Sequence, residues 1–381
     1  MSRTDDAAEL GRDPLDPVAA PSLWAQLFPA RRAMLGVAPT AAPAVAFLLF
    51  GALLGPRGLE VLTADAVLRL SPAVSIGLAT LGVFVGLALG RSLTRGHHRL
   101  LGAAAVEVLV TLLVVTPALY VLLSSWATPV GTSAVLFAVA AGVSSSASAA
   151  SGPRTGRLAR VALIADLDDG PLVLLGSLVV GLVAGVAVWR GLALTVGGGL
   201  LIGAAGWLLF ERARGAAERG VFVAGAVALL GGVAAYTSMS PLLAGAVAAL
   251  VWVWSPGGAD RLIADDLGRL QHPLVALLLV VAGASIEWTP LLAWIVAPLV
   301  LLRLLGKLTA SLVVSPAARV PPGLLATVLL PQGVLGVAIA LNVQQVSPAG
   351  GTVLLSAVAV ATGISELLAA VLLPGEPEPA P

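Results

Sequence analysis

The sequence predicts an all-α polytopic membrane protein with about twelve transmembrane helices. Of its 381 residues, 58% are hydrophobic and only 11% are charged, and its mean hydropathy is +1.01. Soluble domains carry about 25% charged residues. Apolar runs long enough to cross a hydrocarbon layer of about 30 Å recur along the chain. The connections between them are short, which leaves no room for a second folded domain.

Twelve apolar runs are the basis of the predicted helix count. Their approximate bounds are 34–54, 72–90, 100–123, 131–150, 157–188, 191–210, 220–236, 240–254, 272–287, 290–314, 322–342 and 350–373. Residues 1–30 are polar and are expected to form a cytoplasmic N-terminal tail, and residues 31–373 to form the transmembrane domain. Residues 374–381, "PGEPEPAP", have the composition of a disordered tail.

Basic residues predict the orientation in the membrane. With the twelve spans in place, sixteen Lys and Arg residues fall on one side, and three fall on the other, namely Arg57, Arg69 and Arg190. Loops rich in Lys and Arg stay in the cytoplasm. We therefore expect a multi-pass protein of the cytoplasmic (inner) membrane with both termini in the cytoplasm.

Composition and motifs argue against several classes of protein. The chain has no Cys, which excludes disulfides and thiolate metal sites, and its three His residues are too scattered for a metal cluster. The chain has no Walker loop, HExxH motif or GxSxG elbow. We expect neither an enzyme nor a cofactor, and nothing indicates binding to nucleic acid.

Three acids lie in the middle of the fifth apolar run, "RLARVALIADLDDGPLVLLGSLVVG", at Asp166, Asp168 and Asp169. Each ionised carboxylate at the centre of a membrane helix costs about 2.5–3.5 kcal/mol on insertion scales. In a regular helix Asp166 and Asp169 share a face, whereas Asp168 points about 100° away from Asp169. At least one of the three should face a polar cavity. Intramembrane acids of this kind indicate an ion or proton site.

Four further ionisable residues are expected at membrane depth, namely Glu107, Arg303, Lys307 and Glu366. Arg303 and Lys307 are four residues apart and share a face of the helix predicted at 290–314. A buried ion pair that holds this helix against the acid-bearing helix is one interpretation. Buried pairs stabilise little after desolvation, and three carboxylates exceed what such a contact needs. We therefore favour a functional role.

Two apolar runs contain residues that interrupt helices. The run 131–150 contains "GVSSSASAAS", and the run 322–342 contains "LLPQGVLG". Pro and Gly weaken a helix interior, and unwound backbone at membrane depth persists only where it lines a cavity or is buried. Small-residue packing between helices is the alternative. The residues expected to line a cavity are Ser144, Ser145, Ser146, Ser148, Pro331, Gln332 and Gly333.

The order of these features repeats along the chain. One interrupted run precedes the acids of the run 157–188, and a second interrupted run precedes Glu366 in the run 350–373. The two sets are seven helices apart. An odd offset inverts the second set in the membrane, so the pattern predicts inverted-topology repeats.

Several segments resemble the monovalent cation:proton antiporter superfamily, in particular the bacterial type of the sodium/hydrogen exchanger family. "FLLFGALLGPRGLEVLT" is similar to the family's "aGillGPsglg" signature, and "LGVFVGLALG" to its next helix, although Ala88 stands where Glu is frequent. "MSPLLAGAVAALV", "HPLVALLLVVAGASIEW", "LRLLGKLTASLV" and "LLPQGVLGVAIAL" follow in the family's order. The resemblance covers residues from about 34 to 373.

The resemblance implies a homodimer, a domain with two crossed broken helices (the fourth and the eleventh), and exchange of Na⁺, K⁺ or Li⁺ for protons. The family's paired acids match Asp168 and Asp169, which would bind the monovalent cation. In a second possible alignment, on the pattern "QDlaaiP", Asp166 is the matching acid, because Pro171 lies five residues after it.

The resemblance also implies a role for Lys307, which matches the family's Lys in the tenth helix and would compensate the charge of the acids. Lys307 should pair with one carboxylate when no cation is bound. Gln332 departs from the family, whose motif here often reads "PRG", so that a fixed positive charge is lost.

We therefore expect a secondary active transporter that exchanges Na⁺ or K⁺ for protons across the bilayer by alternating access. A proton and a metal cation would compete for the same carboxylates, which couples the two fluxes. The alternative is a K⁺ efflux channel-like system gated by a separate subunit. A membrane scaffold without transport activity would have no need of the buried acids.

Single Cys residues introduced into this Cys-free chain test the orientation. We expect Cys residues in the two terminal tails to react with a membrane-impermeant maleimide in inside-out vesicles and not in intact cells, because the basic loops hold both ends in the cytoplasm. A C-terminus that is labelled from outside intact cells would contradict both the orientation and the inverted repeat.

Overall fold

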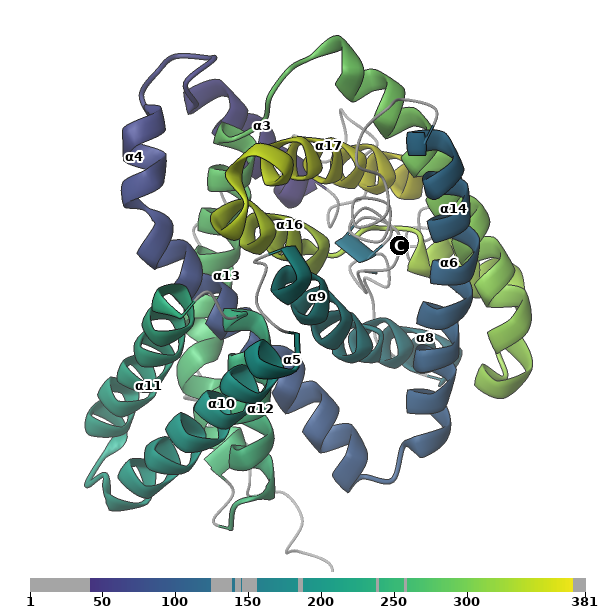
Figure 1. Ribbon diagram of the computed structural model, residues 1–381. Coiled ribbons are helices and arrows are strands. Elements are labelled where there is room, and N and C mark those ends of the chain that lie inside the picture. Colours follow the sequence, from purple (N-terminus) through teal and green to yellow (C-terminus); the bar gives the residue numbers. More distant parts are fainter. Residues whose placement is uncertain are drawn as a thin grey trace, which may run out of the picture.

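A computed structural model describes residues 42–124, 139–140, 145, 156–183, 188–237, 240–256 and 259–372. The regular elements in these ranges are all helices. They form two groups, which lie in different parts of Figure 1.

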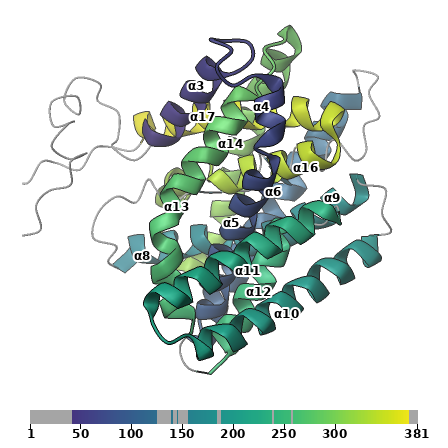
Figure 2. The same ribbon diagram turned by 90° about the vertical axis from the view of Figure 1, so that its left-hand side faces the viewer.

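We call the first group the panel. It consists of α3 (Ala42–Leu54), α5 (Ser71–Thr94), α10 (Val188–Arg212), α11 (Ala216–Tyr236), α12 (Pro241–Trp254) and α13 (Ala259–Ala284). In the panel, α5 packs against α11, α12 and α13, and α3 packs against α13. Figure 2 shows α10, α11 and α12 side by side. The short helix α4 (Ala64–Arg69) leads from α3 into α5.

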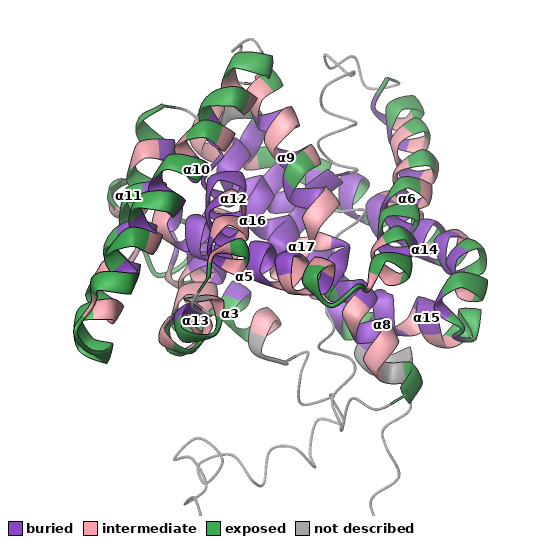
Figure 3. Ribbon diagram, turned by 90° about the horizontal axis from the view of Figure 1, so that it is seen from below, coloured by how far each residue is buried: buried purple, intermediate pink, exposed green. Residues whose placement is uncertain are grey.

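We call the second group the bundle. It consists of α6 (His98–Ser124), α8 (Gly156–Leu167), α9 (Asp169–Val183), α14 (Pro290–Ala318), α15 (Pro322–Leu329), α16 (Val334–Val346) and α17 (Pro348–Leu372). In the bundle, α14 packs against α6, α15 and α17. α16 contacts both groups and is buried from Leu335 to Val343, in the middle of the molecule (Figure 3).

Helix length and hydropathy make this a multi-pass membrane protein. In the part of the chain that the structure describes, seven helices are long and apolar enough to cross a membrane. An eighth span results if α15 and α16, which are bent by 44° at their break, are counted together. Two shorter apolar helices, Ala44–Leu54 and Pro241–Trp254, add to these.

The side chains of α14 are arranged as lipid requires. Four leucines, each 42–64% exposed, form a stripe along one face of this helix: Leu301, Leu305, Leu308 and Leu312. Arg303 and Lys307 are buried instead. An amphipathic helix in water shows the reverse pattern, with its charges outside and its leucines inside. The leucine face of α14 is therefore suited to lipid, and its charged face is turned into the bundle.

The predicted span 157–188 is divided in the structure. α8 and α9 are separated by a turn at Asp168. Pro171 has no N–H with which to bond the carbonyl of Leu167 four residues earlier, and this loss weakens the helix at the turn. The predicted span 131–150 lies almost entirely outside the described residues.

The predicted span 272–287 begins earlier than the hydropathy indicated, because α13 runs from Ala259 to Ala284. Its first half is too polar for an apolar run and is held by ion pairs to other panel helices. Asp260 pairs with Arg91 of α5 (2.9 Å), and Asp266 pairs with Arg219 of α11 (2.8 Å).

Glycines bring backbones of the panel helices into direct contact. A Cβ atom on Gly82 of α5 would lie 2.0 Å from the carbonyl oxygen of Leu242 in α12. A Cβ atom on Gly245 of α12 would lie 2.1 Å from the carbonyl oxygen of Ala79. α3 and α13 approach equally closely at Gly51. Small residues permit such packing in membranes, where helices associate through van der Waals contact.

Hydrogen bonds between small polar groups join the bundle to the panel. Gln345 of α16 donates to the carbonyl oxygen of Ser71 in α5 (3.2 Å). Asn342 of α16 and Ser177 of α9 both donate to Ser240 Oγ, at the start of α12 (3.2 and 2.8 Å). Each such bond contributes about 0.5–1.5 kcal/mol. These hydrogen bonds join the two groups only through side chains and the ends of helices, so breaking them does not disrupt the helices of either group.

Replacing Gly82 with Ala tests the close packing of the panel. In an open helix the change stabilises by about 0.5–1 kcal/mol, but at Gly82 we expect a loss of roughly 1–3 kcal/mol from overpacking. Thermal unfolding in detergent measures the effect. Gly225→Ala in α11 is the matched control, because a Cβ there meets nothing within 4 Å. Equal unfolding temperatures of the two variants would contradict the packing argument.

Candidate ion site

α14 carries two cations into the bundle. Arg303 and Lys307 are one helical turn apart and are 1% and 0% exposed. Charges buried to this degree require ion pairs or hydrogen bonds. The neighbours of each cation define one part of the site.

Lys307 is held by groups from three segments. Its Nζ donates to Glu107 Oε1 of α6 (2.8 Å) and to Ser145 Oγ (2.6 Å). The same Nζ lies 3.7 Å from Asp168 Oδ2, at the junction of α8 and α9. Thr111, one turn after Glu107, donates to Glu107 Oε1 (3.1 Å). Asp168 is therefore the weaker of the two anionic partners, since 3.7 Å exceeds hydrogen-bond distance.

The three acids predicted for the ion site lie in different surroundings. Asp168 is 0% exposed and faces Lys307. Asp169 is half-buried, and its Oδ1 has no hydrogen-bond partner among the described residues. Asp166 is exposed. Asp166 and Asp169 thus differ in exposure although a regular helix would place them on one face.

The predicted break in the run 322–342 lies between α15 and α16. Leu330 still has helical backbone angles (φ −67°, ψ −42°). Pro331 has no N–H with which to continue the helix, and the carbonyl oxygens at this helix end lack intrahelical donors. The Arg303 guanidinium donates to the carbonyl oxygens of Leu329, Leu330 and Pro331 at 3.0–3.4 Å. A cation is also favourable at a helix C-terminus because of the helix dipole. Arg303 thus supplies donors that an unbroken helix would have supplied itself.

Gln332 connects this break to the other interrupted run. Its Nε2 donates to the carbonyl oxygen of Ala140 (3.2 Å), and Gln332 is 1% exposed. A Cβ atom on Gly336 would lie 2.3 Å from the same oxygen. The start of α16 is therefore in direct contact with the segment that contains Ala140.

The residues predicted to line a cavity are described only in part. Pro331, Gln332 and Gly333 are buried at the break, and Ser145 is buried beside Lys307. Ser144, Ser146 and Ser148 lie outside the described residues.

Glu107 is the site residue that sequence reasoning missed, although it is the carboxylate nearest to Lys307. Its depth in the membrane had marked it only as ionisable. The spacing of Glu107 and Thr111, four residues apart on one face, was a further local signal. The pairing itself joins residues 200 positions apart and leaves no mark in a local pattern.

The site combines oxygen atoms with buried charges of both signs. Two fully buried carboxylates, of Glu107 and Asp168, share the ammonium group of Lys307, and the buried guanidinium of Arg303, one helical turn away, also acts on both. Glu107 Oε2 and Gln332 Oε1 are buried without a hydrogen-bond partner in the described part of the chain. Within that part, no group of three or more His, Cys, Asp or Glu residues could hold a metal ion. Two carboxylates that share one ammonium group, together with hard oxygen atoms, suit a proton or a monovalent cation.

These features define a helical membrane protein with an ionisable centre inside its helix bundle. Neither a family model nor a curated protein sequence matches the chain. The structure is similar to that of the sodium proton antiporter MjNhaP1 from Methanocaldococcus jannaschii, with a TM-score of 0.62 and 17% sequence identity. The match covers 87% of this chain and 92% of that chain. The protein therefore has an NhaP-like antiporter fold.

Glu107→Gln tests the charge pairing in the site. We expect a loss of about 1.5–3 kcal/mol in stability, because the variant replaces the carboxylate nearest to Lys307 by a neutral amide and leaves Asp168, at 3.7 Å, as the anionic partner. Adding Lys307→Met should restore much of this loss, because the poorly paired cation disappears. Thermal unfolding in detergent measures both variants, with the exposed Asp166→Asn as the control. If Glu107→Gln unfolded at the same temperature as the wild type, the burial of Lys307 would not depend on its ion pair with Glu107.

Proposed function

We propose that the protein is a secondary active transporter that exchanges a monovalent cation, Na⁺ or K⁺, for protons across the inner membrane. The observation that carries the proposal is that two buried carboxylates, of Glu107 and Asp168, share the ammonium group of Lys307. Lys307 Nζ lies nearer to Glu107 (2.8 Å) than to Asp168 (3.7 Å). Either one proton or one monovalent cation can neutralise Asp168 in its place. Competition between the two for one place couples their movements.

Asp168 is the acid best placed to change partners. Its Oδ2 lies 3.7 Å from Lys307 Nζ, against 2.8 Å for Glu107 Oε1, so less is lost when Asp168 turns to a cation. Asp169 is adjacent in the chain and supplies a second carboxylate, and Ser145 supplies a neutral oxygen. Lys307 remains paired with Glu107 and compensates charge in each state.

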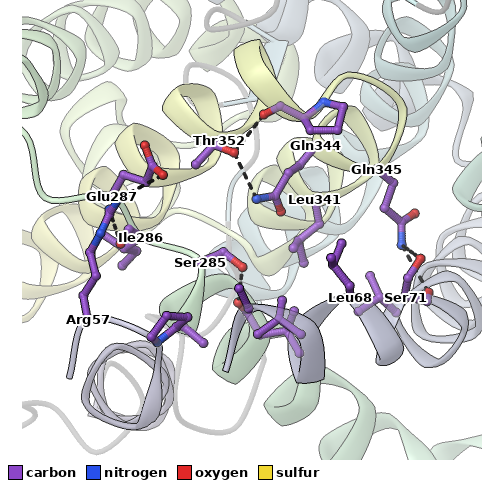
Figure 4. A pocket seen from close by; sticks show the side chains of 17 residues that line it. Arg57, Leu68, Ser71, Ser285, Ile286, Glu287, Leu341, Gln344, Gln345 and Thr352 are labelled. Carbon is purple, nitrogen blue, oxygen red and sulfur yellow. Dashed lines mark hydrogen bonds and ion pairs between the residues drawn. The ribbon is translucent and has the colours of Figure 1, made fainter. Parts of the chain in front are cut away.

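Movement of the bundle against the panel would carry the loaded site across the membrane. The panel is packed backbone against backbone, whereas neutral side-chain hydrogen bonds join it to the bundle. A cavity of about 460 Å³ lies on the boundary between the groups (Figure 4). Ser71 of α5 and Ser285 after α13 line one side of it, and Gln344 and Gln345 of α16 line the other. A boundary of this kind supports rearrangement between two intact groups.

The interrupted helices support the same mechanism. The contact of Gln332 with Ala140 brings the two interrupted runs together, as crossed broken helices of two inverted repeats require. The count of twelve spans, the cytoplasmic termini and the homodimer belong to the same proposal and rest on the sequence. The fold shared with a sodium proton antiporter supports cation and proton as the substrates.

Reconstituted protein tests this function. In proteoliposomes with a preformed pH gradient, we expect added Na⁺ or K⁺ to dissipate the gradient through the wild-type protein. Asp168→Asn should abolish this activity, because an amide neither takes up a proton nor neutralises a cation. Asp166→Asn removes an exposed acid of the same segment and is the matched control, which should retain exchange. A pH-sensitive dye, read cation by cation, is the measurement.

Other outcomes of this experiment separate the alternatives. Loss of exchange in Asp166→Asn alone would favour the second alignment of the acids. Normal exchange in all three single Asn variants at 166, 168 and 169 would place the ion site elsewhere. Cation flux without proton movement would contradict the antiporter and favour a channel-like system.

A further inference from the structure

Glu366 is a buried acid that the proposed exchange does not use. It lies on α17, is 4% exposed, and its Oε2 is buried without a hydrogen-bond partner among the described residues. The hydroxyl of Ser365 beside it is also buried and unpartnered within those residues. A carboxylate in such a place loses its hydration without gaining donors, and binding a proton removes this penalty.

Arg303 is the charged neighbour of Glu366. α17 packs against α3, α13, α14, α15 and α16. Of these helices, α3, α15 and α16 contain no charged side chain, and the charged residues of α13 lie between Asp260 and Arg269, with His272 after them. α14 contributes Arg303, whose charge acts on Glu366, and Lys307, which is paired with Glu107.

Arg303 connects Glu366 to the break between α15 and α16. The same guanidinium donates to the three carbonyl oxygens at the end of α15. In the described residues no hydrogen bond joins it to Glu366, so the two charges interact across space. An ionised Glu366 competes with the carbonyl oxygens for the guanidinium, whereas a neutral Glu366 does not; Glu107 and Asp168 act on the same guanidinium in both cases.

We propose that Glu366 is a second proton-binding site of the bundle, and that a proton bound there fixes the break between α15 and α16 through Arg303. The ligand of this site is a proton and not a metal ion. The site lies on a different helix from Asp168 and acts through Arg303. Asp168 also acts on Arg303, but its ion pair is with Lys307. Proton binding at Glu366 thus controls the broken segment without occupying the ion site.

Amide hydrogen exchange of the full-length protein in detergent tests the proposal. At alkaline pH we expect the amides of Leu330 and of residues 332–336 to exchange roughly tenfold faster in the wild type than in Glu366→Gln, which cannot ionise and keeps Arg303 on the carbonyl groups. At acid pH the two proteins should agree. Glu287→Gln removes a half-exposed acid that pairs with Arg57 and should match the wild type at both pH values.

Two outcomes would overturn the proposal. The first is equal exchange of the amides of Leu330 and of residues 332–336 in the wild type and Glu366→Gln at every pH. The second applies if Glu366→Gln does not fold. Glu366→Asp keeps a titratable acid, so a protection factor of this segment that does not change with pH in this variant would then exclude the role. Amide hydrogen exchange is measured without transport. The result would therefore stand even if Asp168→Asn failed to stop the exchange of cations for protons.

Discussion

The bundle depends on the contacts of two buried cations, which lie on one face of α14. Lys307 joins α14 to α6, to Ser145 and to the junction of α8 and α9, and Arg303 joins it to the end of α15. At membrane depth no bulk water is present to satisfy a charge. Each segment that packs against this face therefore has to present a carboxylate, a hydroxyl or a free carbonyl oxygen.

This requirement explains why helices are interrupted beside α14. An unbroken helix through residues 330–333 would bond its own carbonyl groups and withdraw these acceptors from Arg303. Pro331 and Gly333 prevent that helix and expose the oxygen atoms. In the same way the turn at Asp168, three residues before Pro171, brings a carboxylate toward Lys307 and leaves its neighbour Asp169 only half-buried. The helices are thus interrupted at the positions where their backbone or side-chain oxygen atoms contact the buried cations.

The sequence was informative within single helices and much less so between them. The shared face of Arg303 and Lys307 and the break at Pro331–Gly333 both follow from spacing and residue type, and the structure shows both. The exposure of each of the three acids could not be predicted from a regular helix, because it depends on which segments pack beside each residue. Glu107 as the carboxylate nearest to Lys307 could not be predicted, because only the folded chain brings residues 200 positions apart together.

A physical division runs through the molecule. Glycine contacts between the panel helices involve no titratable group, so neither a proton nor a cation alters them. The bundle instead contains the buried carboxylates that we propose to change charge on binding. The hydrogen bonds between the groups involve Gln345, Asn342 and Ser240, whose amide and hydroxyl groups do not titrate, and apolar side chains of both groups pack in one core. Neither kind of contact changes over the range of pH in which carboxylates titrate. Under the proposed function, binding would therefore alter the bundle from within while its contact with the panel stayed equally strong in each state.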